Sequence, residues 1–157
     1  MTRAGYTLVE LMVMVVVITI LIAGTSWIDS GVRSMNRAAR DSERSSDVSS
    51  VALIFEGYYR DNPTAAGPSY PTTTQVTNSL DTIVENPELL TPPTADTPAF
   101  TAASSSATQT PTDMQYIYQP FTTGGVLCTT APCVRFTLFY KLENDTAIKT
   151  IESRHQQ

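Results

Sequence analysis

Hydrophobic and polar positions divide the chain into three regions. Residues 6–28 are almost continuously apolar, and Glu10 is the only Asp, Glu, Lys or Arg among them. Beyond them apolar residues recur every three or four positions, as Val32, Met35 and Ala39 do, which is typical of an amphipathic helix. In the last third, apolar and polar residues alternate, which is typical of strands. The pattern predicts an α+β fold.

One long helix is predicted over residues 6–59. Its first part, residues 6–28, would be about 35 Å long at 1.5 Å per residue, which is enough to span a bilayer. Residues 29–60 form the amphipathic half, and Asn62-Pro63 stops the helix, because proline disfavours helical geometry in the residue before it. We expect this second half to pack against a small antiparallel β-sheet.

The region between helix and sheet, residues 61–113, is predicted to be mostly loop. A short helix is expected around residues 76–85, where Val76, Leu80 and Val84 share one side. Residues 91–112 are rich in Ser, Thr and Pro, with Asp96 their only charge, and predict an exposed loop.

Residues 114–157 are predicted to form the sheet and a tail. Strands are expected at residues 114–119, 134–142 and 146–151, and Phe136, Leu138 and Tyr140 mark the more apolar face of the second strand. A tight hairpin turn at residues 143–145 is expected, because Asn and Asp tolerate the left-handed backbone that such turns need.

Composition narrows the function. The chain has 157 residues, which suits one ordinary domain, and a net charge of −5, which argues against a nucleic acid as primary partner. A single histidine, His155, and two cysteines are too few for a His/Cys zinc site, and His155 is in the tail, not in a predicted core. We therefore expect no enzyme activity, no cofactor and no metal site.

The start of the chain resembles the class III signal of type IV pilins and type II secretion pseudopilins. Residues 5–10 read Gly-Tyr-Thr-Leu-Val-Glu, after a short leader with Arg3 and before the apolar run. The resemblance implies that residues 1–5 are a leader, cleaved after Gly5 by a prepilin peptidase, and that Tyr6 becomes the methylated N-terminus. Tyr6 departs from the usual Phe but is aromatic. The resemblance is specific over residues 5–23 only.

The resemblance also gives Glu10 a role in filament assembly. An unpaired carboxylate inside hydrocarbon costs about 2.5–3.5 kcal/mol, so Glu10 needs a partner or a route to water. In the family this carboxylate meets the N-terminal amine of a neighbouring subunit, and such a pair offsets the burial cost. The resemblance implies a single-pass membrane protein that becomes part of an extracellular pilus. Its partners would be further copies and sibling pilins, a platform protein and an assembly ATPase.

The two cysteines predict a local disulfide. Cys128 and Cys133 enclose four residues, and in an exported chain a bond between them would stiffen a loop without core contacts. The arginines after the apolar run argue the other way, because the positive-inside rule would keep the following part in the cytoplasm. We give more weight to the class III signal and to the cysteine pair. Arg37 and Asp41, and Arg40 and Glu43, are spaced for ion pairs on a solvated helix face.

Other functions remain open at this stage. A secretory signal explains the apolar run but not Glu10, and a simple membrane anchor explains Glu10 if its side chain reaches the headgroups. A major pseudopilin of a type II secretion system is the nearest alternative, although residues 143–145 offer few oxygens for calcium. A membrane-anchored adhesion domain that never polymerises is a further alternative.

Overall fold

The computed structural model describes residues 7–65 and 67–155, with the backbone alone for residues 24–30. The fold is α+β, as predicted. Its helices are α1 (Leu8–Asp61), α2 (Thr73–Ile83) and the 3₁₀ helix η1 (Pro87–Leu90). Contacts divide the chain into two units, Met1–Arg37 and Ala38–Gln157, and α1 belongs to both.

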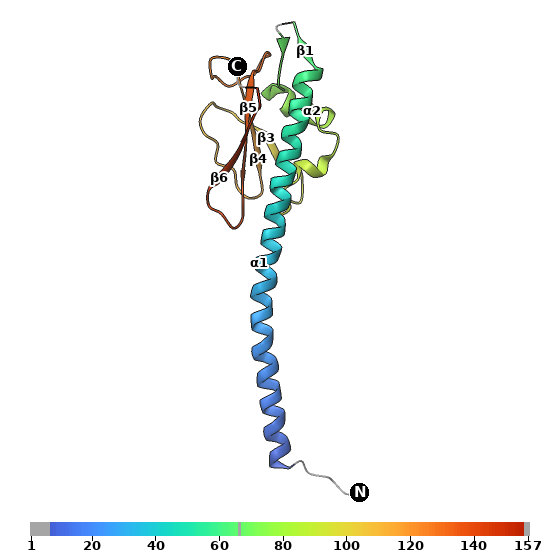
Figure 1. Ribbon diagram of the computed structural model, residues 1–157, viewed down its shortest axis with the longest axis vertical. Coiled ribbons are helices and arrows are strands. Elements are labelled where there is room, and N and C mark those ends of the chain that lie inside the picture. Colours follow the sequence, from blue (N-terminus) through green and yellow to red (C-terminus); the bar gives the residue numbers. More distant parts are fainter. Residues whose placement is uncertain (1–6, 66, 156–157) are drawn as a thin grey trace. The chain divides into compact units, whose positions relative to one another are not determined.

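The second unit contains two sheets (Figure 1). A small one pairs β1 (Pro63–Thr64) with β2 (Gly67–Pro68). The larger sheet has the order β3-β4-β5-β6, where β4–β5 and β5–β6 are antiparallel and β3–β4 is parallel. Its strands are β3 (Phe100–Ala102), β4 (Tyr116–Phe121), β5 (Arg135–Lys141) and β6 (Ile148–Glu152). The three predicted strands are present within two residues of the expected bounds.

The second half of α1 forms the core together with one face of this sheet. Val48, Val51 and Phe55 of α1 are completely buried. The ring of Phe55 meets those of Tyr118 and Phe136 edge to face, with centroids 4.7 Å and 5.8 Å away. The predicted apolar face of β5 is part of this core, because Phe136, Leu138 and Tyr140 belong to it.

The predicted exposed loop at residues 91–112 is partly wrong. Its residues Phe100–Ala102 form β3, and Ala103 after them is buried. The next part of the loop is held by Gln119 of β4, whose buried side-chain amide donates hydrogen bonds of 2.7 Å to the carbonyls of Ser105 and Ala107. The loop therefore covers the sheet face opposite α1.

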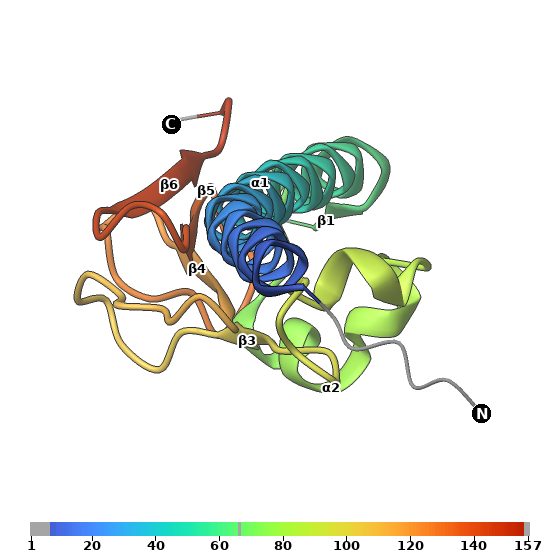
Figure 2. The same cartoon turned by 90° about the horizontal axis from the view of Figure 1, so that it is seen from below.

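Helix α2 begins three residues before its predicted start because Thr72 caps it. The Thr72 hydroxyl accepts from the backbone N–H of Gln75, and the Gln75 side chain accepts from the Thr72 N–H. This reciprocal arrangement is a capping box. Figure 2 shows α2 beside the β3 edge of the sheet.

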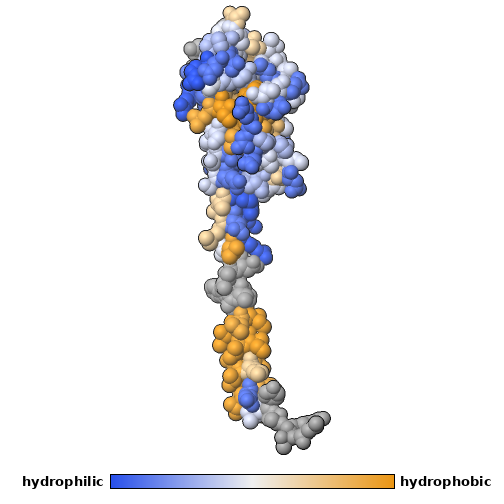
Figure 3. Space-filling view, turned by 90° about the vertical axis from the view of Figure 1, so that its right-hand side faces the viewer, coloured by the Kyte–Doolittle hydropathy of each residue, from blue (hydrophilic) through white to orange (hydrophobic). Residues whose placement is uncertain are grey.

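In the first unit, α1 begins at Leu8, while Tyr6, the predicted start, lies outside the described residues. Residues 8–23 expose their side chains on every side, and Figure 3 shows an almost continuous apolar surface there. The Thr19 hydroxyl donates to the carbonyls of Val15 and Val16, so it needs no outside acceptor. Among the residues described, no helix is both long and apolar enough to cross a membrane.

Candidate functional site

The first candidate site is the start of α1, where Thr7 and Glu10 form a second capping box. The Thr7 backbone N–H and hydroxyl donate to Glu10 Oε2 at 3.1 Å and 3.3 Å, and the Glu10 N–H donates to the Thr7 hydroxyl oxygen at 3.3 Å. These bonds satisfy N–H groups that a helix start otherwise leaves without partners. The other residues of the predicted processing site, Gly5 and Tyr6, lie outside the described part of the chain.

Glu10 is therefore held in place by its own chain. Both bonds that its carboxylate accepts from Thr7 end on Oε2. Around it the helix surface is apolar: Val9 is 68 % exposed and Val13 56 %. The spacing Thr-x-x-Glu is the sequence signature of a capping box, and it could have identified Thr7 as the residue that orients Glu10.

The second candidate site is the disulfide between Cys128 and Cys133, which confirms the predicted pair. Both cysteines are completely buried within the main core. The expectation that their loop lacks core contacts is therefore wrong. Only its middle, residues 129–131, is exposed.

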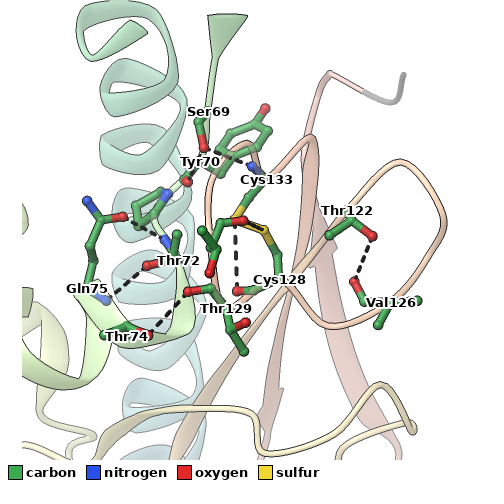
Figure 4. The surroundings of a disulfide bond; sticks show 12 residues. Ser69, Tyr70, Thr72, Thr74, Gln75, Thr122, Val126, Cys128, Thr129 and Cys133 are labelled. Atoms are coloured by element: carbon green, nitrogen blue, oxygen red, sulfur yellow. Dashed lines mark hydrogen bonds between the residues drawn. A yellow bond between two sulfur atoms is a disulfide. The ribbon is translucent and has the colours of Figure 1, made fainter. Parts of the chain in front are cut away.

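Hydrogen bonds connect the backbone of the disulfide loop to the chain that leads into α2 (Figure 4). The N–H of Cys133 donates to the Ser69 hydroxyl at 2.8 Å, and its carbonyl accepts from the Tyr70 N–H at 2.9 Å. The carbonyl of Cys128 accepts from the N–H of Thr73, the first residue of α2, at 3.1 Å. The disulfide thus closes a loop within the β4–β5 connection, and hydrogen bonds attach this loop to the start of α2.

The third candidate site is a buried ionic cluster in the second unit. The guanidinium of Arg40 binds both carboxylate oxygens of Glu143, at 2.6 Å and 2.7 Å. Arg44 is completely buried, and its Nη1 lies 2.9 Å from Asp41 and 3.0 Å from Glu143. The predicted pairing of Arg40 with Glu43 on a solvated helix face is wrong, because Arg40 binds Glu143 on the β5–β6 connection instead.

The cluster also shapes the β5–β6 turn. Asp41 accepts hydrogen bonds from the backbone N–H groups of Glu143 and Asn144, at 2.7 Å and 3.1 Å. In the described part of the chain no residue other than glycine has a positive φ, so the expected left-handed turn is wrong. The turn is stabilised by a carboxylate from α1 and by Asp145, whose Oδ1 accepts from the Ala147 N–H at 2.9 Å, and not by a left-handed backbone.

Electrostatics in the cluster favour the charged state of Glu143. The hydrogen bond from Arg40, and then those from Arg44, lower the pKa of Glu143 to about 2 against its burial. Asp145 in the same turn lies 2.7 Å from Lys149, and this hydrogen bond lowers its pKa. The acidic side chains of this turn are thus paired with cations, a poor arrangement for calcium, which takes six to eight oxygen ligands.

Comparisons with protein-family models, with curated proteins and with solved structures give no match. Of the three candidate sites, the capped Glu10 and the apolar helix around it carry the most specific chemistry.

Proposed function

We propose that the chain is a structural subunit of a type IV pilus or pilus-like filament, cleaved after Gly5 and assembled through its N-terminal helix. The resemblance of residues 5–23 to the class III signal suggests this. The single observation that supports it best is the pair of different surfaces on α1. Residues 8–23 expose apolar side chains all round, and residues 48–59 are a core element of an α+β head.

A helix that is apolar on every side needs an apolar environment, such as lipid or neighbouring helices. Because the Thr19 hydroxyl bonds within its own helix, Glu10 is the one side chain of residues 8–23 that calls for a polar partner. In the membrane, residues 6–28 would be the embedded part. In the filament, the same residues would form a core of packed helices.

Cleavage after Gly5 would create the partner that Glu10 requires. The new amine on Tyr6 carries a positive charge, and a carboxylate on a neighbouring subunit can pair with it. Thr7 holds Glu10 Oε2 from its own chain, so Oε1 is the oxygen available to the neighbour. The pair would set the axial register between subunits.

The proposed partners follow from this assembly. They are a prepilin peptidase, further copies and sibling pilins, a platform protein and an assembly ATPase. The sequence contains no phosphate-binding Gly-Lys motif, so the energy for assembly would come from the ATPase. The protein would be a single-pass membrane protein first and part of an extracellular pilus afterwards.

Intact-mass analysis of protein from the native host tests the proposal. We expect a mature chain that begins at a methylated Tyr6. Gly5→Val should abolish cleavage, while the matched control Gly31→Val, at a helix position with open space around it, should be cleaved normally. A mature start near residue 25 would contradict the proposal and indicate an ordinary signal peptide.

Microscopy of sheared surface material separates the filament function from its alternatives. Filaments outside the cell that contain this chain support a pilin. A periplasmic polymer alone would indicate a pseudopilin, and crosslinks that never join two copies through residues 8–23 would indicate an anchored domain that does not polymerise.

A further inference from the structure

The segment after β6, residues 153–155, folds back onto α1 near its end. The Arg154 N–H donates to Glu56 Oε1 at 2.8 Å. The His155 ring stacks on Tyr59, with centroids 4.8 Å apart and planes 16° apart. Before them, Ser153 is buried and exchanges backbone and side-chain hydrogen bonds with the backbone of Phe136 on β5.

Glu56 of α1 contacts two other segments of the chain, the one that contains Tyr70 and the one that contains Arg154 and His155. Besides the Arg154 N–H, its carboxylate accepts a hydrogen bond from the Tyr70 hydroxyl on Oε2 at 2.9 Å. Nε2 of His155 lies 3.8 Å from the same Oε2. The Glu56 side chain is only 13 % exposed, while that of His155 is 53 % exposed, so one partner is held in place and the other is in reach of solvent protons.

We propose that residues 153–155 are a pH-dependent latch, held against α1 more tightly when His155 is protonated. A neutral imidazole stacks on Tyr59 but carries no net charge. A protonated one adds an electrostatic attraction to Glu56 and a cation–π interaction with the Tyr59 ring. The latch is therefore tighter at acidic pH, where imidazoles carry a proton, than at alkaline pH, where they do not.

Other charged and titratable groups near the latch do not reverse this direction. From α1, Arg60 lies 2.8 Å from Asp61, which offsets its charge. Burial first, and then the hydrogen bond to Glu56, raise the pKa of Tyr70, so its hydroxyl stays a donor. Arg154 is exposed and carries the same charge at acidic and neutral pH, so its effect on His155 is constant.

Opening of the latch would change the surface of the head. Beside it is a groove whose lining includes Leu53, Gly57, Tyr59 and Pro68, together with Arg154 and His155. Leu53 is already 56 % exposed, and release of His155 would add one face of the Tyr59 ring to this surface. The exposed apolar area on this side of α1 would then depend on pH.

The test is hydrogen exchange of the Arg154 amide in the intact chain in detergent micelles, expressed as a protection factor. We expect protection about three-fold higher at a pH of about 5.5 than at about 8, in line with a partly exposed ion pair. His155→Phe keeps the stacked ring without a charge, and should show the lower protection at both pH values. Glu56→Gln should also remove the pH dependence.

Arg60→Gln is the control, because it removes a neighbouring cation outside the latch and should leave the pH dependence unchanged. Equal protection of the wild-type amide at the two pH values would overturn the proposal. A pH dependence in His155→Phe as large as in the wild type would also overturn it. Because His155 is on the surface, His155→Phe tests the proposal even if Glu56→Gln disturbs the core. The latch does not rest on the filament function.

Discussion

The two halves of α1 have the same backbone conformation and opposite surroundings. In the first half the apolar side chains are exposed: Leu8 by 82 %, Val16 by 52 % and Leu21 by 64 %. In the second half Val48, Val51 and Phe55 are completely buried. In the second half most of the apolar residues are gathered on one side of the helix, although Leu53 is exposed and Arg44 is buried.

The difference shows which part of the apolar helix surface the rest of the same chain can cover. A single apolar stripe is covered by one sheet, as β4 and β5 cover residues 48–59. A surface that is apolar all round would need cover on every side, and one small sheet cannot supply that. In the function we propose, lipid and then neighbouring subunits cover the first half.

The largest expected effect concerns solubility. A fragment of residues 38–157 should stay in solution without detergent and unfold cooperatively, because the main core lies within it. The intact chain should partition almost completely into membranes or micelles. Sedimentation without detergent, followed by thermal unfolding monitored by circular dichroism, checks both. An unfolded or aggregated fragment would show that the head depends on the first half of α1.

Next in size is the effect of Glu10 on assembly. Glu10→Ala should insert into the membrane at least as well as wild type, because it removes a charge, but should lower the filament yield about ten-fold or more. Glu10→Asp should fall between them, and Thr7→Ser, which keeps the capping hydroxyl, should assemble normally. The measurement is sheared filament yield beside membrane-pool protein by immunoblot. Normal filaments from Glu10→Ala would remove the pairing role.

Matched truncations in the two halves sharpen the comparison. Phe55→Ala leaves a cavity among aromatic rings and should lower the free energy of unfolding of the head by about 3–5 kcal/mol. Val16→Ala removes only exposed methyl groups and should change it by less than about 0.5 kcal/mol. Denaturant titration of the two variants and the wild type, all in one detergent, measures both changes in the free energy of unfolding. Equal losses would mean that the first half contributes to the folded head.

Removal of the disulfide should have a smaller effect, restricted to the second unit. Cys128→Ser with Cys133→Ser should lower the free energy of unfolding by about 2–4 kcal/mol, since the loop is short but both sulfurs are buried. Amide exchange should rise at Tyr70 and Thr73, whose N–H groups bond to the loop, and the helix content should stay the same. Wild-type protein alkylated without reductant should show no free thiol.

The smallest expected effect is on the acid stability of the head. The lowered pKa of Glu143 means that its ionised form stabilises the fold: this contribution is complete above a pH of about 4.5 and is lost as pH falls toward about 2. Glu143→Gln should lose about 1–2 kcal/mol near neutral pH and show a flatter acid profile. Unfolding free energy measured from pH about 2 to 6 tests this. A parallel profile in the variant would assign the acid loss to other groups.

Sequence patterns predicted the elements whose signals are local. The 3.6-residue period and Asn62-Pro63 predicted α1 almost to its end at Asp61, and alternation predicted β4, β5 and β6. The cysteine pair predicted its own bond because five positions separate the two residues. The capping boxes at Thr7 and Thr72 were equally local, and their Thr-x-x-Glu and Thr-x-x-Gln spacings could have been used.

Elements that depend on distant partners were missed. Strand β3 has three residues and one large apolar side chain, so its pairing with β4 shows only when the two are side by side. Arg40 had an acidic residue at helical spacing, Glu43, but binds Glu143, more than 100 positions away. Local charge spacing predicted Glu43 as the partner of Arg40. This was wrong because the tertiary fold brings Glu143 close enough to bind Arg40 through both carboxylate oxygens.

For the candidate site at the start of α1, the sequence alone determined the chemistry: an apolar run that contains one carboxylate, Glu10. The sequence also predicted that the second half of α1 is the covered one. Only the tertiary structure decided where the disulfide loop packs and that Asp41 holds the β5–β6 turn. The physical reason is range. Helix periodicity and capping act over a few residues, whereas burial and ion pairing depend on segments that only folding brings together.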